Sequence, residues 1–151
     1  MRITAKVDYA VRAAIEMAAA AGGRVKGEAL AERQGIPAKF LENILADLRR
    51  AGIVASQRGS EGGYWLARPP DRVSVADIIR AVEGPLADVH GVPPETVDYP
   101  GPAAALQRVW VATRAALRSI LEEVTMADVV AGRLPPAVER HLAEPDAWSR
   151  R

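Results

Sequence analysis

The chain has 151 residues, 49% of them hydrophobic and 26% charged, so it can bury a core and is not disordered throughout. It contains no cysteine, which excludes disulfides, thiolate metal ligands and cysteine nucleophiles. The formal net charge is only +1, but it is unevenly spread: residues 1–72 hold 12 Lys and Arg against 8 Asp and Glu, and residues 73–151 hold 8 against 11. The first half is therefore the better candidate for binding a polyanion.

The first predicted element is an amphipathic helix that starts near Ile3 and stops at the glycine pair at 22–23. Apolar residues recur in it at helical spacing, and Thr4 is a possible N-cap. Asp8 and Arg12, four residues apart, are predicted to form a surface ion pair. Charged residues interrupt this segment, and nowhere in the chain is an apolar run long enough to span a bilayer, so we expect a cytoplasmic protein.

Two shorter helices are predicted next, GEALAERQ and AKFLENILADLRRAG, separated by the tight break GIP. The second helix places four aliphatic residues at i, i+3, i+4 and i+7, which predicts one buried stripe. The stripe consists of Leu41, Ile44, Leu45 and Leu48. The outward face is predicted to carry Lys39, Glu42, Asn43, Ala46 and Asp47.

A β-hairpin follows, with short strands at 53–57 and 64–67. Between them, RGSEGGYW places three glycines within five positions, which indicates a phosphate loop, a tight turn or close approach to a nucleic-acid backbone. A phosphate loop needs a Lys followed by Ser or Thr and then a helix, which this segment lacks. The turn and the nucleic-acid approach both stay open.

Ser74 and Asp77 resemble the N-terminal cap of a further helix, which Gly84 ends. Residues 84–104 hold five prolines and three glycines and are predicted to be a linker loop. A long helix and a short one capped by Thr125 are expected over 105–132, and a polar, loosely held tail over 133–151. The apolar stripe of the long helix consists of Leu106, Val109, Trp110, Thr113, Leu117, Ile120, Leu121 and Val124.

The order helix, short helix, tight break, helix and hairpin is that of a winged helix-turn-helix, here residues 1–83. The predicted fold class is therefore mainly α with a small β-hairpin wing and a long C-terminal dimerisation helix. The stripe of that helix exceeds what its own domain can cover, so we expect it to pair with a second copy; packing within the monomer is the alternative.

Three segments resemble the Rrf-two family of bacterial winged-helix repressors, which includes the IscR, NsrR and CymR regulators. They are MRITAKVDYAVRA, LAERQGIPAKFLENILADLRRAGIV and RGSEGGYWLARPPDRVSVADIIRAVEGPL, and the resemblance extends to about Gly132. It implies a transcriptional regulator that binds a pseudo-palindromic operator in double-stranded DNA as a homodimer. No set of nucleophile, base and cofactor loop can be assembled, so we expect no enzyme activity.

Many members of that family hold an iron–sulfur cluster through cysteines in the loop before the long helix. The corresponding residues here, 84–105, have none, so we expect no cluster and no other metal cofactor. The chain resembles the cysteine-less members, which respond to a metabolite or a partner protein. A candidate effector pocket would be lined by His90, Tyr99 and Trp110, with Trp65 as a further candidate, although the place of Trp110 in the helix stripe favours a core role.

The resemblance and the pattern together predict a DNA-binding set: Arg2, Lys6, Lys39, Glu42, Asn43, Arg49, Arg58, Ser60, Gly62 and Gly63. Glu42 can accept a hydrogen bond from cytosine and Asn43 can pair with adenine, whereas the cations would contact phosphate. Solvated helix faces are the alternative for each. The alternative function is a winged-helix protein-interaction module that does not read DNA sequence, which the near-neutral net charge favours.

Overall fold

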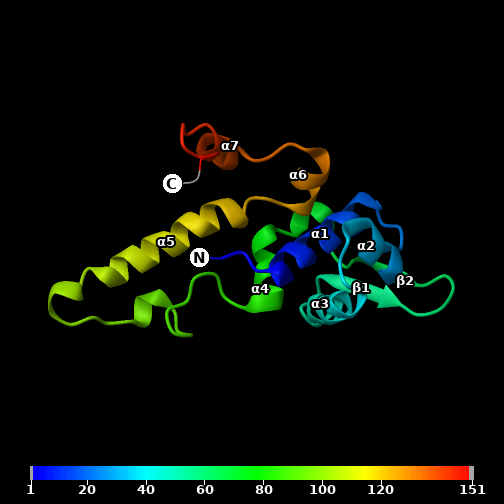
Figure 1. Ribbon diagram of the computed structural model, residues 1–151, viewed down its shortest axis with the longest axis horizontal. Helices are drawn as coiled ribbons and strands as arrows, with labels where there is room; N and C mark the ends of the chain where they lie inside the picture. Colours follow the sequence, from blue (N-terminus) through cyan, green and yellow to red (C-terminus); the bar gives the residue numbers. More distant parts are fainter. Residues whose placement is uncertain (1, 150–151) are drawn as a thin grey trace.

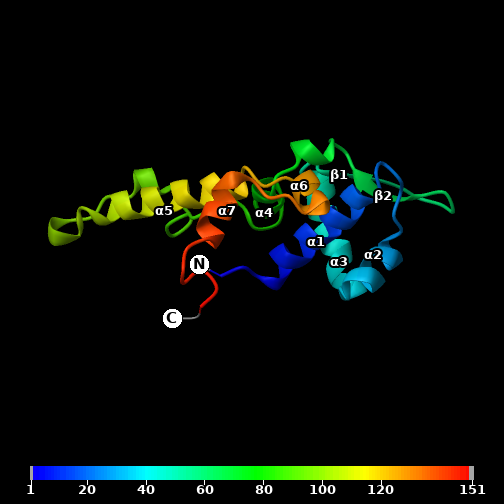
Figure 2. The ribbon, with the colours of Figure 1, turned by 90° about the horizontal axis from the view of Figure 1, so that it is seen from above.

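Residues 2–149 are described by a computed structural model. The helices and strands are α1 Ala5–Ala19, α2 Gly27–Gln34, α3 Ala38–Arg50, β1 Val54–Gln57, β2 Gly63–Leu66, α4 Val75–Glu83, α5 Leu106–Leu121, α6 Met126–Ala131 and α7 Pro136–Leu142. Helices α1 to α4 and α6 gather with the hairpin into one body, and α5 extends away from it (Figures 1 and 2). The predicted fold class, mainly α with a small β-hairpin wing and a long C-terminal helix, is confirmed.

The local signals in the sequence place most element ends correctly. The Thr4 side chain accepts a hydrogen bond from the Val7 amide, and Ser74 and Asp77 form a reciprocal capping box at the start of α4. The hairpin is antiparallel and pairs Val54 with Leu66. The predicted linker is a loop with two short 3₁₀ turns, at 94–96 and 101–103.

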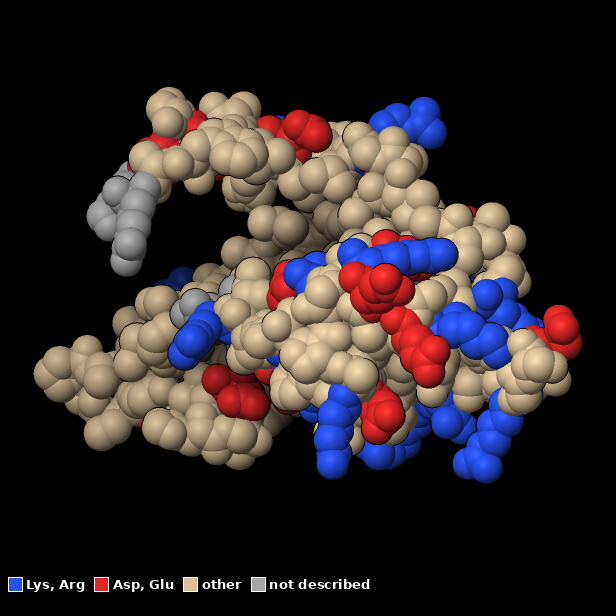
Figure 3. All heavy atoms as spheres, turned by 45° about the vertical axis from the view of Figure 1, so that its right-hand side comes forward, with Lys and Arg blue, Asp and Glu red and all other residues tan. Residues whose placement is uncertain are grey.

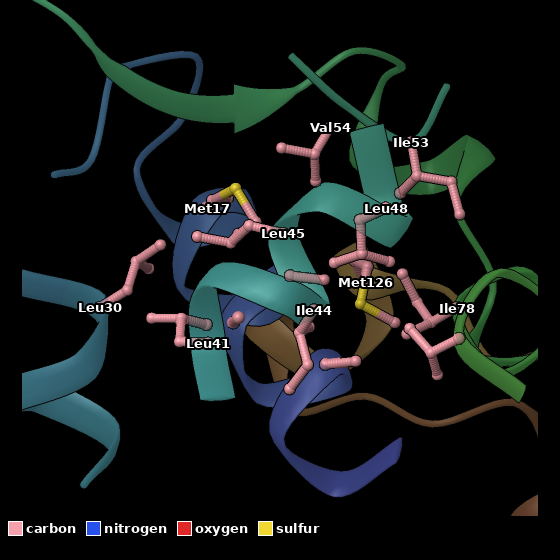
Figure 4. Close-up of a cluster of buried hydrophobic side chains, with 14 of the residues drawn as sticks. Met17, Leu30, Leu41, Ile44, Leu45, Leu48, Ile53, Val54, Ile78 and Met126 are labelled. Carbon is pink, nitrogen blue, oxygen red and sulfur yellow. The ribbon is translucent and has the colours of Figure 1, made fainter. Parts of the chain in front are cut away.

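The core is centred on the aliphatic stripe of α3, whose four residues are each at most 2% exposed. Figure 4 shows them surrounded by side chains from α1, α2, the start of the hairpin, α4 and α6. Among those neighbours, Met17, Leu30, Ile78 and Met126 are also almost fully buried. Because one face of α3 is buried in this way, its opposite face is left outward.

Helix α6 belongs to the core of the winged helix, although the sequence groups it with the long helix. The Val75 amide donates to the Val124 carbonyl at 2.9 Å, and the Met126 amide donates to the Val73 carbonyl at 2.9 Å. Met126 is fully buried beside Ile78 (Figure 4). Val124 lies beyond the end of α5 and is only 7% exposed, so its prediction as a dimerisation residue is wrong: this chain itself buries it.

The C-terminal segment is more ordered than predicted, because residues 136–142 form α7. The proline pair that suggested a broken tail instead starts this helix, since Pro136 occupies its first position, where no amide hydrogen bond is required. Ala137 is buried, and α7 packs against α5.

Lys6 ties three helices together. Its Nζ lies 2.7 Å from Oδ2 of Asp47 on α3 and donates to the carbonyl of Val82 on α4 at 2.8 Å. The hydrogen bond from Lys6, with a smaller effect of Arg50, lowers the pKa of Asp47 below its ordinary value. The ammonium of Lys6, predicted to be free for phosphate, therefore has partners within the chain, and Asp47 is half-buried rather than outward.

Replacing Met126 with Ala should lower the free energy of unfolding by about 2–5 kcal/mol, because it leaves a cavity against α3 and α4. Urea unfolding followed by circular dichroism measures this change. Val130→Ala is the matched control on the same helix, since Val130 is 46% exposed and should cost much less. Equal losses of stability in the two variants would contradict the assignment of α6 to the core.

Replacing Lys6 with Met should cost about 1–2 kcal/mol, because it breaks a half-buried ion pair and a hydrogen bond to a backbone carbonyl. The pKa of Asp47 is lowered in the native state, so the contribution of the pair is full at neutral pH and is lost as the pH falls below about 4. Urea unfolding at several pH values should show wild type and variant converging in acid.

Arg50→Met is the control for that series, because Arg50 also pairs with Asp47 but its side chain is 76% exposed. We expect it to change the stability by less than about 0.5 kcal/mol. If the Lys6 variant were as stable as the Arg50 variant at neutral pH, the contacts of Lys6 with Asp47 and Val82 would not stabilise the fold.

Candidate nucleic-acid interface

The outward face of α3 presents the polar side chains that the sequence predicts. Gly35 ends α2 in the left-handed conformation at φ +61°, and Ile36, only 4% exposed, anchors the turn that starts α3. Lys39, Glu42 and Asn43 are all exposed, opposite the buried stripe. A helix held in this way can insert its first turns into a groove of DNA.

Two neighbouring grooves lie between α3 and the hairpin. One, of about 500 Å³, separates the start of α2 from α3 and includes Glu42; the other, of about 450 Å³, includes Arg49 and Arg58. Lys26 and Tyr64 line both grooves. The structure thus brings two predicted cations, one from α3 and one from the hairpin, to a single concave surface.

Figure 3 shows Lys and Arg side chains projecting from the end of the molecule that carries the hairpin, with Asp and Glu among them. Arg58 and Ser60 are exposed in the hairpin loop, and Arg2 is exposed ahead of α1. Positive and negative side chains are therefore mixed on this face, and the positive ones are not a continuous patch.

Gly62 and Gly63 are buried in this chain, and Gly63 lines the groove that includes Arg49 and Arg58, so their role as DNA contacts stays a prediction. A Cβ at position 62 would lie 2.1 Å from the Gln57 carbonyl oxygen, and one at position 63 would lie 2.9 Å from the Val25 carbonyl oxygen. The closure of the hairpin and its packing on the strand-like residue Val25 therefore require these glycines. Gly59, at φ +100°, is the exposed glycine of the loop.

Two basic residues before α2 hold the hairpin loop, and sequence reasoning missed both. Nζ of Lys26 donates to the Gly59 carbonyl at 2.7 Å, and Nη1 of Arg24 donates to the Glu61 carbonyl at 2.9 Å. The Arg24 guanidinium also lies 5.0 Å from the ring centroid of Trp65. The spacing of the sequence does not indicate these contacts, because the bridge between Val25 and Tyr64 that brings them to the hairpin joins segments far apart along the chain.

The predicted effector residues are brought together only in part. Nε1 of Trp110 donates to the Tyr99 hydroxyl at 3.1 Å, so linker and α5 meet there. His90 is exposed in a turn of the linker at φ +53°, and Trp65 lies on β2 against Arg24. Trp110 is 37% exposed, so the core role favoured for it is wrong within this chain.

Among the residues that the structure describes, none on α5 is fully buried. Val109 is 51% exposed, and Leu106, Leu117, Ile120 and Leu121 are half-buried, whereas Thr113 is exposed. Over residues 2–149, no group of three or more potential metal-ligating side chains is found, and no helix is long and apolar enough to cross a membrane.

Residues 3–132 match the model of the Rrf-two family, Rrf2, which is described as an iron-dependent transcriptional regulator. The chain is 51% identical over 139 residues to Rv1287 of Mycobacterium tuberculosis, provisionally named an HTH-type transcriptional regulator, with 91% of this chain and 86% of that protein covered.

Two solved structures have the same fold. CymR, the global cysteine regulator of B. subtilis, has a TM-score of 0.74 at 31% identity and covers 87% of this chain and 98% of its own. IscR of T. potens has a TM-score of 0.72 at 32% identity, with 87% and 88% covered. The family model spans most of this chain, and both solved structures share the winged-helix fold of this chain. The chain belongs to the Rrf2 family of winged-helix transcriptional regulators.

Proposed function

We propose that this protein is a sequence-specific repressor that binds a pseudo-palindromic operator as a homodimer. The observation that carries the proposal is the shared surface of α3 and the hairpin, where an exposed polar helix face borders two grooves. Lys26 lines both grooves, and Arg49 and Arg58 line the second. A recognition helix beside a basic wing matches the groove and the flanking phosphates of B-form DNA.

Base reading is assigned to the first turns of α3. Glu42 accepts a hydrogen bond from a cytosine amino group and Asn43 pairs with adenine, each worth about 1–3 kcal/mol of discrimination. Lys39 donates to guanine or to phosphate. Arg49 and Arg58 contact phosphates on either side of the groove they line, and Ser60 and Arg2 extend the backbone contacts.

The homodimer is proposed from the uncovered stripe of α5. Its apolar residues from Leu106 to Leu121 remain partly exposed in the described chain, and a two-fold pairing of α5 with the same helix of a second copy would cover them. Two recognition helices then face half-sites separated by one or more turns of DNA, about 10 bp each. Occupying a promoter in this way blocks transcription.

We propose that this regulator works without an iron–sulfur cluster, in contrast to the iron-dependent description of its family. The support is chemical: cluster ligation relies on thiolates, and the sequence has no cysteine. A metabolite or partner protein is then the effector, and it would act at the contact between Tyr99, near the C-terminal end of the linker, and Trp110 on α5. We assign the protein no enzyme activity and place it in the cytoplasm.

The experiment that tests the function is selection of bound fragments of the source genome with purified protein at moderate salt. Recovery of a shared inverted repeat is expected. Weak binding without a common motif would instead favour a winged-helix protein-interaction module, for which the net charge of +1 is the one supporting observation.

Replacing Arg58 with Ala should weaken operator binding and flatten its salt dependence. Each lost phosphate contact reduces the slope of log K against log salt by about 0.9, so a dimer should lose nearly two units. Fluorescence anisotropy over a salt series measures the slope. Arg140→Ala, an exposed residue of α7, is the control and should leave the slope unchanged. An unchanged slope for Arg58→Ala would show that the wing does not contact phosphate.

Replacing Leu117 with Asp should convert the dimer to a monomer, because a carboxylate would be buried in the apolar stripe of α5. Sedimentation equilibrium reports the mass, and circular dichroism checks that the helices persist. Ala115→Asp, on the opposite side of α5 and exposed, is the control that should remain dimeric. A dimeric Leu117→Asp protein would show that the interface lies elsewhere.

A further inference from the structure

An aromatic pair joins the start of α3 to α1. Phe40, the third residue of α3, is 41% exposed. Its ring meets that of Tyr9 on α1 edge to face, with centroids 5.7 Å apart and an interplanar angle of 85°. The pair therefore gives the exposed phenyl group a defined orientation.

Tyr9 is itself in contact with Arg12 of the same helix. The guanidinium of Arg12 lies 5.0 Å from the Tyr9 ring centroid, and its Nη1 is 3.4 Å from Oδ2 of Asp8. Its Nη2 donates to the carbonyl of Gln34, the last residue of α2. Arg12 thus connects α1 to the turn that leads into α3, and it fixes the Tyr9 ring that Phe40 contacts.

Phe40 lies among the residues of α3 that we assign to base reading. Lys39 precedes it, and Glu42 and Asn43 follow within the same turn, all exposed. The first residues of a recognition helix reach deepest into the major groove. There the thymine C5-methyl is the apolar group that base pairs display, and phenylalanine is among the side chains suited to contact it.

We propose that Phe40 contacts a thymine methyl group in each half-site, and that Tyr9 and Arg12 are positioning residues for it. This inference rests on the proposed function and adds to it one specific feature of the operator: a thymine whose methyl group the protein senses. An exposed apolar side chain without a binding role is the competing account.

The test uses the inverted-repeat duplex recovered by the genomic selection. Each thymine of one half-site, with its symmetry mate, is replaced in turn by deoxyuridine, which lacks only the methyl group. Wild-type protein should bind one of these duplexes about fourfold more weakly per half-site, the effect expected for losing one buried methyl contact. Phe40→Ala should bind that duplex and the thymine duplex equally.

Three variants separate contact from positioning. Lys39→Ala, next in the chain, should keep the full methyl effect. Tyr9→Phe retains the ring contact and should keep it as well, whereas Tyr9→Leu should reduce it. Phe40→Ala should leave the salt slope unchanged, because the lost contact carries no charge. Urea unfolding checks that each variant is folded, and Phe40→Leu serves as a second, milder replacement.

Two results would overturn the inference while leaving the proposed function intact: no thymine position at which the wild type senses the methyl group, or the same methyl effect in Phe40→Ala. The first needs no variant at all. If the genomic selection recovers no motif, the proposed function fails at that earlier step and the inference fails with it.

Discussion

The structure depends on the burial of one face of α3. Four aliphatic side chains on that face contact α1, α4, α6 and the start of the hairpin, so the helix cannot rotate without opening the core. The same constraint turns Lys39, Glu42 and Asn43 outward. Packing therefore sets the orientation of the helix face that we assign to DNA. The ion pair between Lys6 and Asp47 further fixes α3 against α1.

The core is closed by a segment that comes after the extended helix. Main-chain hydrogen bonds join residues 73–75 to 124–126, and Met126 fills the space between α3 and α4. The chain thus leaves the body through the linker, runs along α5 and returns to the body at α6. A displacement of α5 would therefore act on both connections, the proline-rich linker before it and the hydrogen-bonded residues 124–126 after it.

The hairpin is attached to the body in a comparable way. Arg24 and Lys26 donate to carbonyls of its loop, while Gly62 and Gly63 allow the two main-chain segments to approach closely. These contacts leave Arg58 and Ser60 exposed at one rim of the grooves beside α3. Wing and helix are held by different contacts, so phosphate binding and base reading can be altered separately.

The sequence by itself determined the features that depend on neighbours along the chain: the caps at Thr4 and Ser74, the stripe of α3, the hairpin and the winged-helix order. Predictions from the sequence were wrong or missing where contacts join segments far apart along the chain. The partners of Lys6, the anchoring of the hairpin by Arg24 and Lys26, and the burial of Val124 involve residues with no fixed spacing. Only the tertiary structure decided these, because periodicity shows which face of a helix is apolar but not what that face meets.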